Sequence, residues 1–193
     1  MKPITRTLLG LGLATVAAAG VPQPAAAQGP GGFWLSGGLG AGINLNDEID
    51  GNQVGGGSAY IRIGGTTSRR IRLGFEGIRW ARGSSSNTVG SGSSSFIAVF
   101  SPSSKIGGYL KGGAGRATIS RTQRSGNTKT VASTVGLAFT GGVGWEIRVR
   151  PKLYLTPSVD YLLQLFGSEQ DSVLGPVPET NSLLLLTVGL TLR

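Results

Sequence analysis

The chain has 193 residues, of which 34 are glycine, and only 14 % of its residues carry a charged side chain. Average soluble proteins contain about 7 % glycine and about 25 % charged residues, so this composition excludes a highly charged disordered chain. The sequence contains neither cysteine nor histidine. This excludes a disulfide framework and catalysis by a Ser-His or Cys-His pair.

The start of the chain has the three parts of a secretory signal peptide. Lys2 and Arg6 are followed by a run of apolar and small residues, and Ala25-Ala26-Ala27 has the small residues of a cleavage site. A membrane anchor is the alternative, but the apolar run is short and prolines follow it. We therefore expect a signal peptide at residues 1–27, cleaved near Ala27, and one exported domain at residues 28–193.

The exported part of the chain alternates between apolar residues and small or polar residues, which indicates β-strands with two different faces. In the clearest run, 135–149, the odd positions are mostly large and apolar, and the even positions are small or charged. A tilted strand crosses a bilayer in about 9–11 residues, so this run is long enough to do so. Seven further stretches complete a set of eight predicted strands: 33–43, 58–63, 71–76, 96–100, 109–114, 153–164 and 184–193.

The predicted connections alternate between long and short, as in an up-and-down meander with one end outside the cell and the other in the periplasm. The long connections fall at 45–53, 82–93, 120–129 and 167–180, and those at 82–93 and 120–129 include Ser- and Gly-rich or basic sequence. Glycine and charge share one face of the strands, and apolar bulk occupies the other. This favours small and charged residues inside a narrow barrel over the alternative, a soluble sandwich or lipocalin-like barrel with an apolar interior.

The predicted fold class is therefore all-β, an eight-stranded antiparallel up-and-down transmembrane β-barrel after a cleaved signal peptide. Pro157 has no N–H to donate within its predicted strand, so we expect a local bulge there. The runs at 110–115, 140–148 and 188–192 resemble the small outer-membrane β-barrel proteins of Gram-negative bacteria, of the OmpA, OmpX and OmpW type. Members of that family typically end in an aromatic residue, whereas this chain ends in Leu192-Arg193.

The resemblance implies an outer-membrane location and three kinds of partner. These are outer-membrane lipid, lipopolysaccharide and the barrel-assembly machinery. The sequence pI of about 10.7 would otherwise suggest nucleic acid as a partner, but export argues against it. We expect a monomer without cofactor.

Seven charged residues share the predicted inward face and form a candidate lumen cluster: Arg62, Arg72, Glu76, Lys111, Glu146, Arg148 and Asp160. They could line a selective channel, or they could pair with one another and fill the interior. Eight strands enclose a lumen just wide enough for side chains to fill. The strand number therefore favours the filled interior.

Basic residues gather at the third long connection, with Arg121, Arg124 and Lys129 within it and Arg116 just before it. Arginine suits phosphate, so these four residues are candidates for contact with lipopolysaccharide, and the alternative is a solvated basic loop. For the whole protein we predict a structural or surface-interaction role. The alternatives are a small channel or transporter for hydrophobic or small polar solutes and an unusual histidine-free enzyme. We expect no enzyme activity, catalytic residue or metal site.

Overall fold

The computed structural model describes residues 32–46, 54–83, 87–102, 107–125, 128–167, 171–172, 175–176 and 179–193. The predicted signal peptide at 1–27 lies outside these residues. Eight long strands form the barrel: β1 (Phe33–Asn44), β2 (Val54–Thr66), β3 (Ile71–Gly83), β4 (Asn87–Phe100), β5 (Gly108–Ser125), β6 (Thr128–Trp145), β8 (Leu153–Phe166) and β11 (Thr180–Leu192). No helix long and apolar enough to cross a membrane occurs in the described part of the chain.

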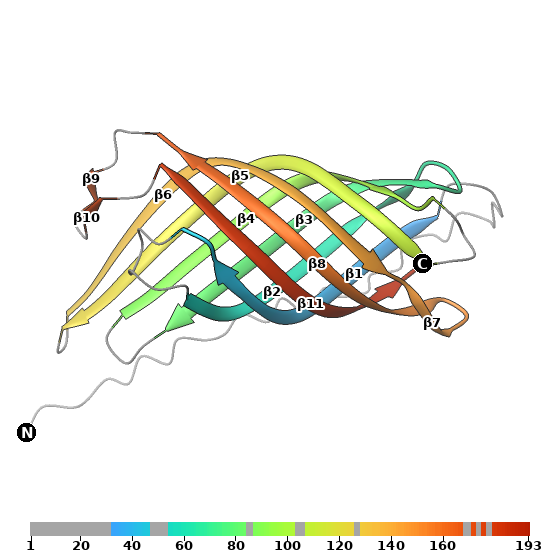
Figure 1. Ribbon diagram of the computed structural model, residues 1–193, viewed down its shortest axis with the longest axis horizontal. Helices are drawn as coiled ribbons and strands as arrows, with labels where there is room; N and C mark the ends of the chain where they lie inside the picture. Colours follow the sequence, from blue (N-terminus) through green and yellow to red (C-terminus); the bar gives the residue numbers. More distant parts are fainter. Residues whose placement is uncertain are drawn as a thin grey trace, which may run out of the picture.

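Each long strand runs antiparallel to its neighbours in chain order, and β11 closes the sheet by pairing with both β1 and β8 (Figure 1). The short strand β7 (Ile147–Arg150) follows β6 and also pairs with β8. A separate two-stranded ladder joins β9 (Asp171–Ser172) to β10 (Gly175–Pro176). The predicted fold class, a closed eight-stranded up-and-down barrel, is confirmed.

The two ends of the barrel differ. The C-terminus, β7 and the turn at 151–152 lie at one end, called the turn end below, and β9, β10 and the tip of the β5–β6 hairpin lie at the other, called the loop end (Figure 1). The strands β5 and β6 have 18 residues each. The ladder between β6 and β8 begins only at Gly136. The hairpin therefore extends beyond the β8 wall at the loop end.

The outward face of the barrel is a band of large apolar side chains. Leu39, Phe75, Leu137 and Leu186 are each more than 60 % exposed, and the Phe75 and Phe96 rings pack edge-to-face with centroids 5.6 Å apart. A contiguous apolar band of this kind is unfavourable in water and is the surface that a transmembrane barrel presents to lipid. The closed ladder pairs the backbone groups along the wall, as lipid requires.

Two of the predicted long loops are largely strand. β4 begins at Asn87 and β5 continues to Ser125, so the predicted loops at 82–93 and 120–129 were wrong over most of their length. The Ser- and Gly-rich composition suggested a flexible linker. In the structure, Ser93 and Ser95 are buried side chains of β4. Small residues here permit close packing inside the barrel.

The β8 ladder on the side of β6 and β7 is interrupted at Pro157, whereas on the other side Pro157 is paired with Val188 of β11. The last β6–β8 pair joins Gly144 to Ser158, and the next pair toward the turn end joins Ile147 of β7 to Leu155. Because Pro157 has no N–H to donate, the unpaired stretch falls where a ladder bond would be missing in any case. In place of the predicted bulge, the structure has a gap in the ladder at Pro157. The register shift lies closer to the turn end, between Arg148 and Arg150 of β7.

The interior of the barrel is not uniformly small and polar, contrary to the sequence-based expectation. Its loop-end half holds a buried apolar cluster: Tyr60, Ile78, Trp80, Ala117, Ile119, Ala138, Leu162, Phe166, Leu183 and Leu185. A smaller cluster of Trp34, Ile97, Val99 and Tyr109 lies toward the turn end. Charged side chains occupy the space between and beside these clusters, so apolar and charged layers fill different levels of one lumen.

Candidate functional site

Four charged side chains from four different strands meet inside the barrel. Arg62 comes from β2, Glu76 from β3, Lys111 from β5 and Asp160 from β8. Each is at most 5 % exposed. Alternation along each strand turns these side chains inward, and their two positive and two negative charges balance. We call this set the central network.

Arg62 holds the central network together across the lumen. Its Nε donates to Oε2 of Glu76 at 2.6 Å, and its Nη2 donates to Oδ2 of Asp160 at 2.7 Å. Its third nitrogen, Nη1, donates to the hydroxyl of Tyr109 at 3.1 Å. The guanidinium also stacks 3.9 Å from the centre of the Tyr60 ring. A buried charge that is paired and hydrogen-bonded on every side avoids most of the desolvation penalty.

Lys111 makes a second connection between the same two carboxylates. Its Nζ forms ion pairs with Oε2 of Glu76 and, at 2.9 Å, with Oδ1 of Asp160. The remaining oxygen of Glu76 accepts a hydrogen bond of 3.2 Å from Thr140 Oγ1, and Asp160 accepts one of 3.1 Å from Ser158. Each carboxylate is therefore bound by two cations and one hydroxyl.

A glycine makes room for this network. A Cβ atom at Gly142 would lie 2.2 Å from Oδ1 of Asp160 and 2.8 Å from the backbone oxygen of Val159. Both distances are shorter than carbon–oxygen contacts allow. Gly142 is opposite Asp160 in the β6–β8 ladder, so its lack of a side chain leaves room for Oδ1 of Asp160, the oxygen that pairs with Lys111.

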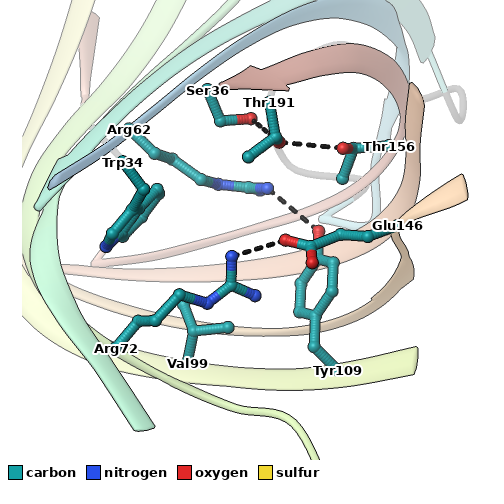
Figure 2. A pocket seen from close by; sticks show the side chains of 9 residues that line it. All are labelled: Trp34, Ser36, Arg62, Arg72, Val99, Tyr109, Glu146, Thr156 and Thr191. Atoms are coloured by element: carbon teal, nitrogen blue, oxygen red, sulfur yellow. Dashed lines mark hydrogen bonds and ion pairs between the residues drawn. The ribbon is translucent and has the colours of Figure 1, made fainter. Parts of the chain in front are cut away.

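A second group of charges lies nearer the turn end (Figure 2). Nη1 of Arg72 donates to Oε1 of Glu146 at 2.5 Å, and Nη1 of Arg193 lies 2.9 Å from Oε2 of the same carboxylate. The Arg193 side chain is 36 % exposed and packs on the Tyr154 ring, 4.3 Å from its centre. We call these three residues the rim group, because they form the last charged layer before the turn end.

A small pocket lies between the central network and the rim group (Figure 2). A chain of hydroxyls forms one wall: Thr191 donates to Ser36 at 2.8 Å and lies 2.8 Å from the hydroxyl of Thr156. Trp34 forms another wall, and its indole Nε1 has no hydrogen-bond partner in the described structure. The pocket is narrow because Arg62 and Arg72 both project into it.

Toward the loop end, an uncharged polar layer crosses the lumen within the apolar cluster. Oε1 of Gln164 accepts hydrogen bonds from Ser91 at 2.5 Å and from Asn181 at 2.7 Å, and its Nε2 donates to the backbone oxygen of Gly92 at 2.7 Å. The Asn181 oxygen accepts from Asn44 at 2.9 Å. These bonds connect β1, β4, β8 and β11 and hold opposite walls together.

Six of the seven residues of the predicted lumen cluster lie inside the barrel. The exception is Arg148, which is exposed on β7. It has the inward alternation, but it lies between the Glu146 layer and the turn at 151–152, where the lumen already opens. The charged-residue criterion also missed Tyr60 and Tyr109, which share the inward face with Arg62 and Lys111, and Arg193, which joins the rim group.

The four predicted lipopolysaccharide contacts do not share one surface. Arg116 is exposed on the outward face of β5, whereas Arg121 has the opposite alternation and is only partly exposed. Arg124 and Lys129 are partners in the β5–β6 ladder. Their side chains lie outside the described residues.

The interior of the described barrel offers ion pairs and hydrogen bonds. Without histidine or cysteine, none of its hydroxyls has an imidazole or thiolate neighbour to activate it. The described part of the chain contains no cluster of acidic side chains suited to a metal ion. The arrangement is suited to holding the walls of the barrel together.

Comparisons with known proteins identify the fold. No protein-family model and no curated protein matches the chain. Among solved structures, Neisserial surface protein A is 16 % identical, with a TM-score of 0.56 over 83 % of this chain and 96 % of the other. The attachment invasion locus protein Ail of Yersinia pestis is 14 % identical, with a TM-score of 0.55 over 82 % and 97 %.

The N-terminal β-barrel domain of Pseudomonas aeruginosa OprF is 13 % identical, with a TM-score of 0.50 over 83 % of this chain and 98 % of the other. These similarities span nearly the whole of each solved structure. At this level of identity they concern the fold and not individual residues. The chain has the fold of the small eight-stranded outer-membrane β-barrels.

Proposed function

We propose that the protein is a closed barrel of the Gram-negative outer membrane with a structural or surface-interaction role, and that it is neither a channel nor an enzyme. The observation that carries this proposal is the central network. Its four buried charges come from β2, β3, β5 and β8. Three of its ion pairs, Arg62–Asp160, Lys111–Glu76 and Lys111–Asp160, join strands that are not neighbours in the sheet.

Energetics support a closed lumen. Removing one partner of a buried ion pair costs about 3–5 kcal/mol, so an ion passing through the network would have to displace contacts of comparable strength. Beyond the network, an ion would meet the apolar cluster, which has Leu162 and Leu183 fully buried at its centre. A layer of buried apolar side chains opposes the passage of a charged solute.

The loop end supports the surface-interaction part of the proposal. The β5–β6 hairpin extends beyond the β8 wall there, and Val131 on its outer face is 57 % exposed. Segments that extend from a rigid scaffold commonly carry binding functions. The Ail barrel, which has a similar fold, is named as an attachment protein and has been crystallised with the heparin analogue sucrose octasulfate. A fold of this type can thus carry a surface role.

Contact with lipopolysaccharide belongs to the same proposal. Arg116 supports it, because it is exposed on the face that carries the apolar band. The alternation of Arg121 points it toward the axis of the barrel, so it is a weaker candidate. The barrel-assembly machinery and a monomeric state remain our expectations for biogenesis and assembly.

Conductance recording in planar bilayers tests the closed-barrel proposal. We expect wild-type protein to insert without steady openings. A matched variant with all four network residues changed to alanine tests whether the apolar cluster alone keeps the lumen closed. We expect at most brief openings, and its folding is checked by its heat-dependent mobility on gels. Resolved wild-type openings whose ion selectivity changes in Glu146→Gln would overturn the proposal in favour of a channel.

A further inference from the structure

Two arginines lie on the outward face of the barrel, where the band is otherwise apolar or small. Arg79 on β3 and Arg116 on β5 are both exposed. They flank β4, because Arg79 is opposite Gly92 and Arg116 is opposite Ser94 in the two ladders. Adjacent strands are about 4.8 Å apart. The two arginines therefore emerge about 10 Å apart across the sheet and two residues apart along it.

The Arg79 side chain leans over β4 toward the β5 side. A Cβ atom at Gly92 would lie 2.9 Å from Cδ and 3.0 Å from Nη1 of Arg79. Gly92 is buried although it has the outward alternation of the exposed Ser94, because Arg79 covers it. The Arg79 guanidinium is thus held above the strand that separates it from Arg116, and the Ser94 hydroxyl lies between the two.

Neither arginine has a counter-charge in the part of the protein that the structure describes. The three carboxylates of the barrel wall, Glu76, Glu146 and Asp160, are buried inside and each is bound by two cations. Arg79 and Arg116 make no ion pair or hydrogen bond with the described residues. An unpaired arginine facing hydrocarbon is costly, so this pair calls for an anion from outside the chain.

The two arginines lie near the loop-end border of the lipid-facing band, as their distance from the turn end of the barrel indicates. Each arginine is eight residues from the turn-end start of its strand, Ile71 for Arg79 and Gly108 for Arg116. A rise of about 3.3 Å per residue and a tilt of about 40° give a height of about 20 Å, within an apolar band about 25 Å tall. Arginine side chains extend toward the headgroups from such a depth. The headgroups in question are those of the leaflet at the loop end.

We propose that Arg79 and Arg116, with Ser94 between them, bind a phosphate group of a lipid headgroup in the outer leaflet. Planar guanidinium groups bind phosphate oxygens with two parallel hydrogen bonds, and two of them on either side of one strand suit a single phosphomonoester. This inference rests on the proposed lipopolysaccharide contact and narrows it. It adds Arg79, keeps Arg116 and leaves Arg121 out.

Native mass spectrometry of the folded barrel in detergent tests the site. The probes are bisphosphorylated lipid A, the same lipid with its phosphates removed, and inorganic phosphate as a competitor. The double variant R79Q/R116Q is compared with wild type and with R69Q, which removes an exposed arginine at the turn end. Heat-dependent gel mobility verifies folding, and the two single variants are measured alongside.

We expect wild type and R69Q to retain lipid A about tenfold more than the dephosphorylated lipid, and R79Q/R116Q to lose about tenfold of this retention. The single variants should lie between. Equal retention by wild type and R79Q/R116Q would overturn the site, as would equal binding of both lipid forms. Full competition by inorganic phosphate would assign the site to a free anion instead of a lipid. None of these outcomes alters conductance, so a failed lipid site leaves the closed-barrel proposal to its own test.

Discussion

Arg62 and Asp160 join strands that are three positions apart around the barrel, with Nη2 of Arg62 2.7 Å from Oδ2 of Asp160. The pair therefore acts across the lumen and not along the wall. Wall ladders alone would allow the barrel to flatten, whereas a contact across the lumen resists it. The stability of the barrel is thus linked to the charges that close it.

Asp160→Asn should destabilise the barrel strongly. The substitution keeps the shape of the side chain but leaves Arg62 and Lys111 with only one carboxylate, that of Glu76. We expect a loss of about 3–5 kcal/mol of unfolding free energy, the cost of breaking a buried pair. Urea unfolding in lipid vesicles measures this loss. The exposed Arg150→Gln serves as control, and a change below about 0.5 kcal/mol, typical of surface sites, would show that the network is not structural.

Glu146→Gln should remove two contacts of unequal strength, because one of the two partners of Glu146 is partly exposed. The contact with Arg72 is buried, whereas Arg193 is 36 % exposed. A double-mutant cycle of Glu146→Gln with Arg193→Gln should give a coupling energy of at most about 1 kcal/mol. The cycle with Arg72→Gln should give a larger one. Equal couplings in both cycles would contradict the placement of Arg193 at the rim.

The strand alternation was predictable from the sequence because a lipid-facing wall imposes it on every strand. From this alternation, the inward orientation of the side chains was predicted correctly for Arg62, Glu76, Lys111 and Asp160. Their pairing was not predictable, since it depends on which strands face each other across the lumen. Arg148 shows the limit of alternation, because it has the inward phase but lies where the barrel ends and water begins.

The amino-acid composition gave a wrong loop prediction where small residues pack inside the barrel. The Ser- and Gly-rich stretch before Phe96 has the composition of a linker, yet it forms most of β4. The apolar loop-end half was missed because Trp80 and Leu162 have the alternation expected of polar lumen residues. Eight strands leave so narrow an interior that bulky apolar side chains fill it as well as ion pairs do.

Phe139→Arg tests which face meets lipid. Phe139 is 45 % exposed in the outward band of β6. It is opposite Ala114, six residues from the turn-end start of β5, so it lies near the middle of the band, where an arginine costs about 2–4 kcal/mol. Val131→Arg is the matched control, because Val131 is outward on the same strand but belongs to the loop-end extension. We expect it to cost at most about 1 kcal/mol. Similar losses in vesicle refolding titrations would show that the band does not end where the structure indicates.

Gly142→Ala tests whether the network depends on a missing side chain. The new Cβ would lie 2.2 Å from Oδ1 of Asp160, so the carboxylate must move away from Lys111 or the strand must shift. Forcing atoms into a packed interior costs about 1–3 kcal/mol. At Gly112, on the outward face of β5, a Cβ meets no atom within 4 Å, and Gly112→Ala should be neutral or stabilising by about 0.4–1 kcal/mol. Equal unfolding free energies for the two variants in urea titrations would mean that Asp160 does not need the space that Gly142 leaves.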